Sequence, residues 1–256
     1  MDVPVTYQVK DNVALLTLDR PEKRNAITTK MALRIRDLCE EVNRDDEVRC
    51  LVITGSGGQA FCAGTDVGSL DEFQTPWQLR RRPAYTDYVR GVEKCVIAAV
   101  NGYAFGGGLE LALSCDIRIA SRQASFAAPE VKLGWIGGGG MAALLTHSIG
   151  PSNAAFMLCT GDPVDADRAL RWGLVSEVLP AGDLIGRALD IARTIASRPP
   201  IATQVAKLNL RAAHHLTVDD AIRYERDLQT LTFYTEDAEE GRRAFQEKRP
   251  GVFRGR

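Results

Sequence analysis

Short apolar runs alternate with amphipathic stretches along the first half of the chain. Residues 13–18 (VALLTL) and 48–54 (VRCLVIT) are rich in β-branched side chains and bounded by polar or turn residues, which predicts two buried strands. Four apolar residues between them share one face of a helix that is expected to begin near Thr28 and Thr29: Met31, Ile35, Leu38 and Val42. A strand, a helix and a strand in this order predict a parallel pair joined by a right-handed crossover.

The same alternation recurs further along the chain. Residues 96–100 (VIAAV) and 116–120 (DIRIA) are expected to form strands, with a helix in the stretch between them. Beyond about residue 150 the strand pattern fades, and 174–178 (LVSEV) is the last candidate. Three later segments have helical patterns: 182–197, 201–214 and 217–247. The pattern therefore predicts an α/β core followed by a helical C-terminal part.

Two glycine-containing turns each follow a predicted strand. One is 60–66 (AFCAGTD), and the other is 106–108 (GGG), which leads into the apolar run 109–113. The first turn of a helix has free N–H groups and a partial positive charge, and glycines let a ligand atom approach them. Tight packing of a helix on a strand explains the glycines of one turn equally well. Two such turns, however, can direct two N–H groups at one point, as an oxyanion hole requires.

Two carboxylates stand in apolar surroundings. Glu110 lies within the run LELAL, and Glu130 follows Pro129 in the stretch SFAAPEV. Taken singly, each glutamate fits a surface or ion-paired position better than a catalytic one. As a pair they are candidates for separate acid and base roles, because burial and mutual repulsion shift the pKa values of such groups.

Five stretches of the sequence together resemble the enoyl-CoA hydratase/isomerase (crotonase) superfamily, and the resemblance covers essentially the full length. Their order and spacing make the match specific: 18–26 (LDRPEKRNA), 60–66 (AFCAGTD), 101–112 (NGYAFGGGLELA), Pro129-Glu130 with Leu133-Gly134, and 240–249 (EGRRAFQEKR). The resemblance implies an α/β crotonase-like spiral of ββα turns over residues 1–195. It also implies that residues 196–256 form a helical segment through which the chains assemble as trimers or dimers of trimers.

The resemblance assigns roles to four residues at the reacting centre. The backbone N–H groups of Thr65 and Gly107 would bind the thioester oxygen. Glu110 would accept a proton from the water that attacks C3, and Glu130 would deliver a proton to C2. The implied activity is reversible hydration of 2-trans-enoyl-CoA thioesters. Coenzyme A is then part of the substrate, and no other cofactor and no metal is expected.

Other reactions of the family are compared through the same motifs. Many Δ3,Δ2-enoyl-CoA isomerases keep only the second glutamate, so the presence of both favours hydration. Dehalogenase and dienoyl-CoA isomerase relatives carry an essential aspartate at the position of Gly138, which argues against both reactions. Hydratases usually have a proline where this chain has Trp135, so Trp135 is expected to shape the acyl pocket. Thr65 replaces a common alanine, and its hydroxyl favours a polar acyl group. The alternatives are therefore the isomerase and a hydratase or dehydratase of a polar acyl-CoA.

The resemblance also implies where coenzyme A binds. Contacts are assigned to six residues: Arg24, Ala26, Ala63, Asp66, Phe245 and Lys248. The last two lie on the final helix and match residues that reach the adenine and phosphates, commonly those of a neighbouring subunit. Any single basic residue here fits a solvated surface charge equally well. The run 80–82 (RRR) is interpreted as surface, with contact to a phosphate as the minor alternative.

Composition narrows the class of protein. The formal net charge is -1, with 45% hydrophobic and 25% charged residues, as in ordinary soluble globular proteins. This charge gives no reason to expect nucleic acid or an anionic membrane as a partner. The six cysteines lack CxxC spacing, and most lie in apolar runs, so free thiols are expected. There is no export or import signal, and no apolar run approaches the ~20 residues needed to span a membrane, so a cytoplasmic location is expected.

Two other classes compete with this interpretation. A dinucleotide-binding motif is suggested by Gly137, Gly139 and Ala142 with Asp162 about twenty residues on, but no predicted strand directly precedes it. A serine hydrolase would need His147, His214 or His215 as its base, and the chain contains no GxSxG. The three histidines also lack the spacing of a metal site.

Overall fold

Two β-sheets form the core of the protein, a computed structural model of which describes residues 3–256. The larger sheet has six strands in the order β1 (Val5–Lys10), β2 (Val13–Leu18), β3 (Cys50–Gly55), β5 (Cys95–Val100), β7 (Ile117–Ser121) and β10 (Glu177–Leu179). Only β1 and β2 run antiparallel to each other, and the other neighbours are parallel. The smaller sheet has the order β4 (Ala60–Cys62), β6 (Tyr103–Phe105), β8 (Ser125–Ala127) and β9 (Val164–Asp165).

The chain winds through both sheets as a spiral. Strands β3, β5 and β7 of the larger sheet are each followed by a short strand of the smaller sheet, β4, β6 and β8 respectively. Each of these turns then continues into helical structure. The loops that follow the short strands therefore lie near one another, because parallel strands end at the same edge of a sheet. This is the crotonase-like α/β architecture that the sequence predicts.

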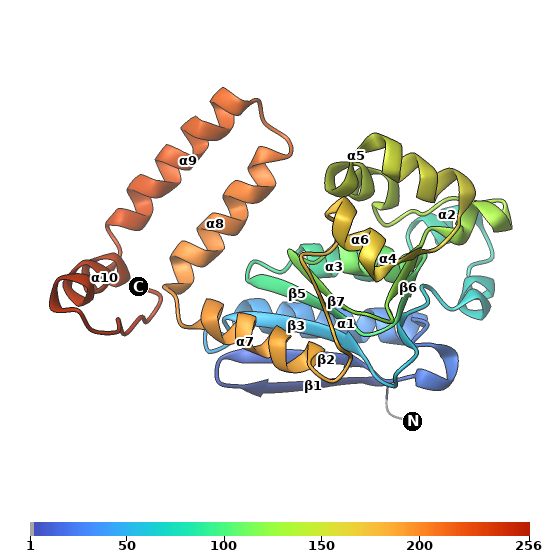
Figure 1. The fold of residues 1–256 in the computed structure, drawn as a ribbon, viewed down its shortest axis with the longest axis horizontal. Coiled ribbons are helices and arrows are strands. Elements are labelled where there is room, and N and C mark those ends of the chain that lie inside the picture. The colour runs from blue at the N-terminus through green and yellow to red at the C-terminus, as the bar shows by residue number, and fades with distance from the viewer. Residues whose placement is uncertain (1–2) are drawn as a thin grey trace.

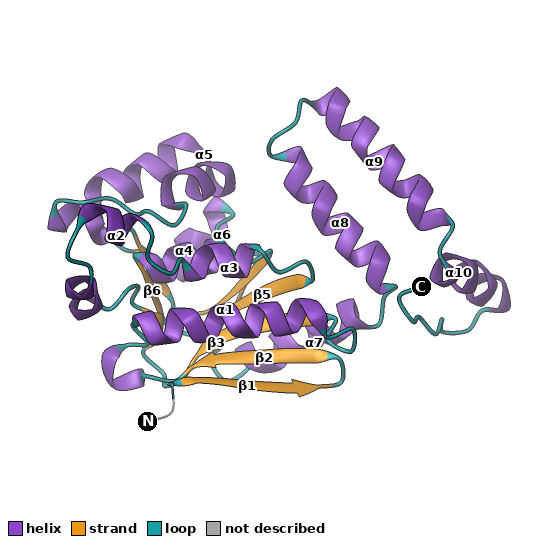
Figure 2. Ribbon diagram, turned by 180° about the vertical axis from the view of Figure 1, so that it is seen from behind, coloured by secondary structure: helices purple, strands orange, loops and turns teal. Residues whose placement is uncertain are grey.

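Helices cover both faces of the larger sheet (Figures 1 and 2). On one face, α1 (Thr29–Arg44) buries its predicted apolar stripe, and the Thr28 hydroxyl accepts a hydrogen bond from the Met31 N–H at 3.3 Å. On the other face, α7 (Leu184–Ala196) packs small side chains against β3 and β5. The other helices of the core are α2 (Pro76–Arg80), α3 (Tyr85–Arg90), α4 (Gly107–Leu113), α5 (Met141–Thr160) and α6 (Ala166–Trp172).

Most of the predicted elements are present, with three differences. The strand expected at 174–178 is β10, which begins only at Glu177. The helical segment 217–247 consists of two helices, α9 (Val218–Phe233) and α10 (Glu236–Glu247), because the Thr235 hydroxyl caps a new helix by accepting from the Ala238 N–H. Strand β1 and the smaller sheet were not predicted.

The C-terminal helices project from the core. Helix α8 (Pro200–Ala213) and α9 form an antiparallel hairpin that stands away from the sheets, and α10 lies beyond its base (Figures 1 and 2). No residue of α9 is buried. The segment from α8 to α10, here called the C-terminal arm, exposes large apolar side chains, among them Leu210, Leu231, Phe233 and Tyr234. An apolar surface of this kind is typical of an interface with another chain.

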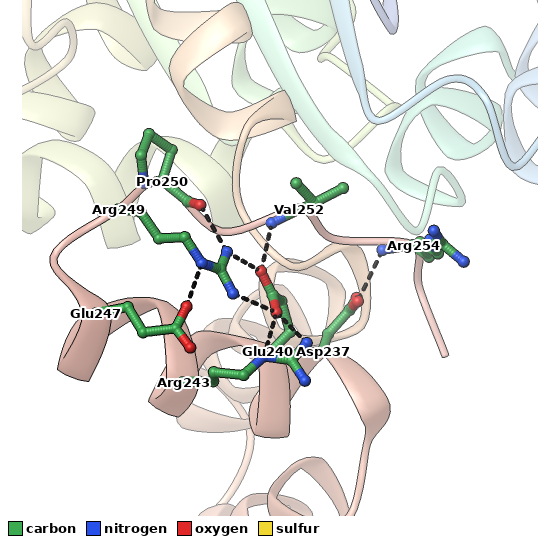
Figure 3. Close-up of polar contacts among 8 residues, drawn as sticks. All are labelled: Asp237, Glu240, Arg243, Glu247, Arg249, Pro250, Val252 and Arg254. Atoms are coloured by element: carbon green, nitrogen blue, oxygen red, sulfur yellow. Dashed lines mark hydrogen bonds and ion pairs between the residues drawn. The ribbon is translucent and has the colours of Figure 1, made fainter.

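The last residues of the chain fold back onto α10 through two carboxylates (Figure 3). Asp237 accepts hydrogen bonds from the N–H groups of Arg254 and Gly255, both at 2.7 Å. Glu240 binds the guanidinium groups of Arg243 and Arg249, and it also accepts from the N–H of Val252 at 3.0 Å. The two carboxylates of α10 therefore hold the tail.

The cysteines are free thiols, as predicted, and four of them are buried. In the part of the chain that the structure describes, no helix combines the length and the apolar character needed to cross a bilayer.

Candidate active site

The glycine turn before α4 brings backbone into close contact with its surroundings. A Cβ on Gly108 would lie 1.9 Å from the carbonyl oxygen of Cys62, and one on Gly107 would lie 2.0 Å from the Tyr85 hydroxyl. Gly106 has φ 56° and donates its N–H to the carbonyl of Ala127 at 2.9 Å. Tight packing therefore does require glycines here. It also leaves the N–H of Gly107 at the first position of a helix, where it has no partner within the helix.

The second turn places another N–H beside the first. The residues on either side of Thr65 both bond to Ile27: the Gly64 carbonyl accepts at 2.8 Å, and the Asp66 N–H donates at 2.9 Å. The N–H of Thr65 consequently faces away from Ile27. A Cβ on Gly64 would lie only 2.9 Å from the nitrogen of Gly107. Within residues 3–256, neither the Thr65 N–H nor the Gly107 N–H donates a hydrogen bond.

Glu110 is buried at the end of the first turn of α4, with a relative exposure of 6%. Its Oε1 accepts hydrogen bonds from the N–H groups of Gly139 at 2.6 Å and Met141 at 3.3 Å. Burial raises the pKa of the Glu110 carboxyl, and these N–H groups and the guanidinium groups of Arg82 and Arg90 oppose the increase. The acid is fixed in position, and no residue of the described part of the chain forms a direct ion pair with it.

Glu130 lies in the 3-10 helix Pro129–Leu133, against the same glycine turn. Its Oε1 is 3.1 Å from the position that a Cβ on Gly106 would occupy. Its Oε2 is buried and has no hydrogen-bond partner among the described residues. Burial raises the pKa of Glu130, and the charge of Glu110 adds to the increase. The two glutamates predicted from the sequence therefore lie close together, beside the free N–H groups.

Two residues of the site were missed by sequence reasoning. Tyr85 is buried, and its hydroxyl lies 3.2 Å from the hydroxyl of Thr65. Burial raises the pKa of Tyr85, so the phenol is neutral. Arg82 was interpreted as surface, but it is half-buried, and its Nη2 lies 3.5 Å from the position of a Cβ on Gly138. Arg82 precedes α3 and Tyr85 begins it, and no local pattern in the sequence marks either residue.

Four of the predicted coenzyme A contacts lie on two adjoining loops. The Ala63 N–H donates to the carbonyl of Arg24 at 3.0 Å, and the carbonyl of Ala26 accepts from Arg20 at 3.2 Å. Asp66 pairs with Arg20, and this contact holds the pKa of the Asp66 carboxyl below its usual range. The Asp66 carboxylate is therefore already occupied by a protein cation.

The other predicted contacts lie elsewhere. Phe245 and Lys248 are exposed on and just after α10, at the opposite end of the molecule from α2 and β6 (Figure 1). They are not part of the site of their own chain. Trp135, which was expected to shape the acyl pocket, is 44% exposed, and its backbone N–H donates to the carbonyl of Glu130 at 3.2 Å.

The competing sites, for a dinucleotide, a serine hydrolase or a metal ion, do not form within residues 3–256. The 3-10 helix Pro129–Leu133 and irregular chain precede Gly137 instead of a strand, and Gly137 and Gly139 lie against Glu110, so the dinucleotide motif is wrong. The ring of His147 packs edge-on against that of His214, with centroids 4.9 Å apart. Across residues 3–256, no three His, Cys, Asp or Glu side chains are grouped as a metal ion would need.

Comparison with known proteins points to one family. The profile of the enoyl-CoA hydratase/isomerase family matches residues 8–256. The chain is 37% identical over 256 residues to the (E)-benzylidenesuccinyl-CoA hydratase of Thauera aromatica, covering 99% of this chain and 100% of the relative. It is also 37% identical to the crotonyl-CoA hydratase of Syntrophomonas wolfei, covering 97% of each. A crystal structure of an enoyl-CoA hydratase from Bacillus anthracis superposes with a TM-score of 0.94 at 30% identity, covering 99% of this chain and 100% of that one. The chain therefore belongs to the enoyl-CoA hydratase/isomerase family.

Proposed function

We propose that the protein catalyses the reversible addition of water to 2-trans-enoyl-CoA thioesters. The observation that carries the proposal is the position of two carboxylates, the buried Glu110 and the half-buried Glu130, against one glycine turn whose N–H group is free. Coenzyme A is part of the substrate, and the proposed mechanism uses no further cofactor.

The backbone N–H groups of Thr65 and Gly107 polarise the thioester carbonyl. A conjugated thioester is a weak electrophile until charge can develop on this oxygen. Donors fixed in a site that excludes water stabilise the resulting enolate, and loss of one such donor typically costs ~10²–10³ in rate. Neither N–H must first break a bond to the protein within residues 3–256, which supports this role.

The two glutamates divide the proton transfers. Glu110, held by two N–H groups, orients the attacking water and accepts its proton as oxygen bonds to C3. Glu130 delivers a proton to C2. Its raised pKa suits a carboxyl group that must be protonated when the reaction starts, and its unpartnered Oε2 suits a group whose partner is the substrate.

The test is the loss of conjugated enoyl absorbance when the purified protein is mixed with crotonyl-CoA. Glu110→Gln and Glu130→Gln should each lower turnover about 100-fold or more, because general acid or base catalysis contributes about 10²–10⁴. Exposed Glu93→Gln is the matched control and should keep wild-type turnover. Wild-type turnover in either active-site variant would contradict the two-acid mechanism.

A second candidate is the shift of a double bond from Δ3 to Δ2. This reaction needs the same N–H pair but only one acid, and the unpartnered oxygen of Glu130 could serve it. Assay of 3-hexenoyl-CoA separates the two functions. An isomerase would keep its activity in Glu110→Gln, whereas a hydratase loses its main activity in that variant.

We also propose that residues 196–256 assemble the chains into a trimer or a dimer of trimers. The exposed apolar side chains of the C-terminal arm support this role, and assembly would bring Phe245 and Lys248 to the coenzyme A of a neighbouring chain. Sedimentation should give a mass near three or six chains of 28.0 kDa. Phe233→Asp should reduce this mass, while Val9→Asp, another exposed apolar position, should not.

A further inference from the structure

We propose that the Arg82 guanidinium binds a carboxylate carried by the acyl group, so that the preferred substrates are CoA thioesters of unsaturated dicarboxylic acids. The choice of reaction rests on the proposed hydration, but the recognition of the carboxylate does not.

Arg82 lies between the Thr65 turn and the glycine loop that follows Glu130. It lines a pocket together with Thr65, whose turn holds a free N–H group, and Tyr85 of α3, whose hydroxyl lies 3.2 Å from that of Thr65. On its other side, its Nη2 faces Gly138 at 3.5 Å from the position of a Cβ. Gly138 directly precedes Gly139, which is bonded to Glu110. The guanidinium therefore lies between the Thr65 turn and the glycine loop that binds Glu110.

Among the described residues, the guanidinium has no anionic partner. Within residues 3–256, its one hydrogen bond is from Nη1 to the carbonyl of Leu79 at 3.0 Å, and no carboxylate lies within 4.0 Å. Nearby arginines differ in this respect, since Arg20 pairs with Asp66 and Arg90 pairs with Asp87. A half-buried guanidinium with free donors is well suited to a planar carboxylate, which it can bind through two parallel hydrogen bonds.

The space beside Arg82 is open because of Gly138. A Cβ on Gly137 or Gly139 would press against Glu110, at 2.8 and 2.6 Å from its oxygens. At Gly138 the guanidinium of Arg82 is the nearest group, at ordinary contact distance. Gly138 also has no positive φ, so the backbone does not require glycine there. A ligand carboxylate can occupy the volume that a side chain at this position would fill.

Binding of saturated acyl-CoA compounds tests recognition without turnover. Calorimetry with the full-length protein would compare adipyl-CoA with hexanoyl-CoA, glutaryl-CoA with pentanoyl-CoA, and succinyl-CoA with butyryl-CoA. At one of these lengths or more, the carboxylated compound should bind about tenfold tighter or better, as expected for a charged hydrogen-bonded pair. Arg82→Gln should remove this preference, and the control Arg81→Gln, which removes the same charge one residue away, should keep it.

Two results would overturn the proposal. One is the absence of a preference at all three lengths. The other is an equal loss of affinity for free CoA and for both members of each pair in Arg82→Gln, which would mean that Arg82 binds a phosphate of CoA.

Gly138→Asp tests the same site with Arg82 intact. The new carboxylate should pair with the guanidinium and compete with the ligand, so the preference for the carboxylated compound should fall well below that of Gly138→Asn, a neutral side chain of similar size. Equal preference in the two variants would contradict the proposed position of the ligand carboxylate.

Turnover separates this inference from the proposed reaction. The substrates are 2-hexenoyl-CoA and 5-carboxy-2-pentenoyl-CoA, which differ only in a terminal methyl or carboxylate group. Equal hydration of both, with no binding preference, would overturn the role of Arg82 and leave the hydratase. Hydration of neither, with the binding preference intact, would overturn the hydratase and leave the carboxylate site.

Discussion

The Oε1 atom of Glu110 accepts a hydrogen bond from the N–H of Gly139 at 2.6 Å. This bond links α4 to the glycine loop that follows Glu130, although the two residues are far apart in sequence. It explains why the loop contains glycines on both sides of position 138, since side chains at Gly137 and Gly139 would collide with the carboxylate. The loop therefore determines where the proposed base can lie.

Gly139→Ala should displace Glu110 and slow the reaction. The new Cβ would lie 2.6 Å from Oε2 of Glu110 and 2.8 Å from the Thr86 hydroxyl, so the carboxylate must move. Misplacement of a catalytic group by about 1 Å can cost about 100-fold, so kcat for crotonyl-CoA should fall at least tenfold. Gly58→Ala is the control, because no atom lies within 4 Å of the position of its Cβ. An unchanged kcat in Gly139→Ala would show that the position of Glu110 does not limit the rate.

Glu110→Gln should lose activity without losing stability. Burial raises the pKa of Glu110, so the folded protein binds this proton more tightly than the unfolded chain does. The ionised carboxylate therefore costs stability, and the cost appears as pH rises from the unfolded pKa of about 4.3 through the higher folded value. A glutamine oxygen can accept the same N–H bonds without the charge.

The melting temperature of Glu110→Gln should accordingly match or exceed that of the wild type at about pH 7.5, and the difference should shrink below about pH 4. Calorimetry across this range checks both points. A lower melting temperature at neutral pH would mean that Glu110 stabilises the fold through contacts that glutamine cannot make.

The sequence predicted the larger sheet better than the smaller one, for a physical reason. Strands β2, β3 and β5 are buried runs of six residues with β-branched side chains, which give a clear signal. Strands β4, β6 and β8 have three residues each, which is too short for any period to be recognised. They form because the spiral places them side by side.

The residues of the candidate site were also predicted only in part. Glu110, Glu130 and the two glycine turns were predicted, because acids in apolar runs and glycines before a helix are visible locally. Arg82 and Tyr85 were not, because the chain between α2 and α3 has no repeating pattern. Their place in the site depends on how α3 packs against α1 and α4, which no local signal reports.

The pH dependence of the reaction should report Arg82 as well as Glu110. The proposed base acts only when ionised, so the acidic limb of kcat/KM follows the raised pKa of Glu110. The guanidinium of Arg82 favours the ionised form and lowers this pKa. In Arg82→Gln the acidic limb for 2-hexenoyl-CoA should therefore move to higher pH, while in Arg81→Gln it should stay in place. A limb that is unchanged or moves to lower pH in Arg82→Gln would show that its charge does not act on the base.

Alanine substitutions at the adjacent Gly107 and Gly108 should lower thermal stability through different contacts. At Gly108 a Cβ would meet the carbonyl oxygen of Cys62 at 1.9 Å, and backbone there cannot move without disrupting the smaller sheet. At Gly107 it would meet the Tyr85 hydroxyl at 2.0 Å, which can be removed. Tyr85→Phe should thus restore part of the thermal stability lost in Gly107→Ala but none of that lost in Gly108→Ala. Thermal unfolding of the single and double variants measures this rescue. Equal rescue of both glycine variants would contradict the contacts described here.

Glu240→Gln should release the C-terminal tail from α10. Hydrogen bonds from Arg249 and Arg243 hold the pKa of Glu240 far below its usual range, so its stabilising contribution is complete above the unfolded pKa of about 4.3 and is lost only as pH falls through the low folded value. The amide keeps the shape of the side chain but loses the charge that binds both guanidinium groups. Trypsin should then cleave after Lys248 faster than in the wild type, at about pH 7.5, because Arg249 is no longer held by the carboxylate.

The neighbouring Glu239→Gln is the matched control, because Glu239 is exposed and its carboxylate makes no ion pair within residues 3–256. The difference in tail protection between Glu240→Gln and the wild type should persist to about pH 4, since Glu240 is still ionised there. Hydrogen exchange of the N–H of Val252, which donates to Glu240 at 3.0 Å, measures it residue by residue. Protection that disappears in the wild type near pH 4 would mean that Glu240 titrates like an exposed glutamate. Equal protection in Glu240→Gln and the wild type would mean that the Asp237 contacts hold the tail instead.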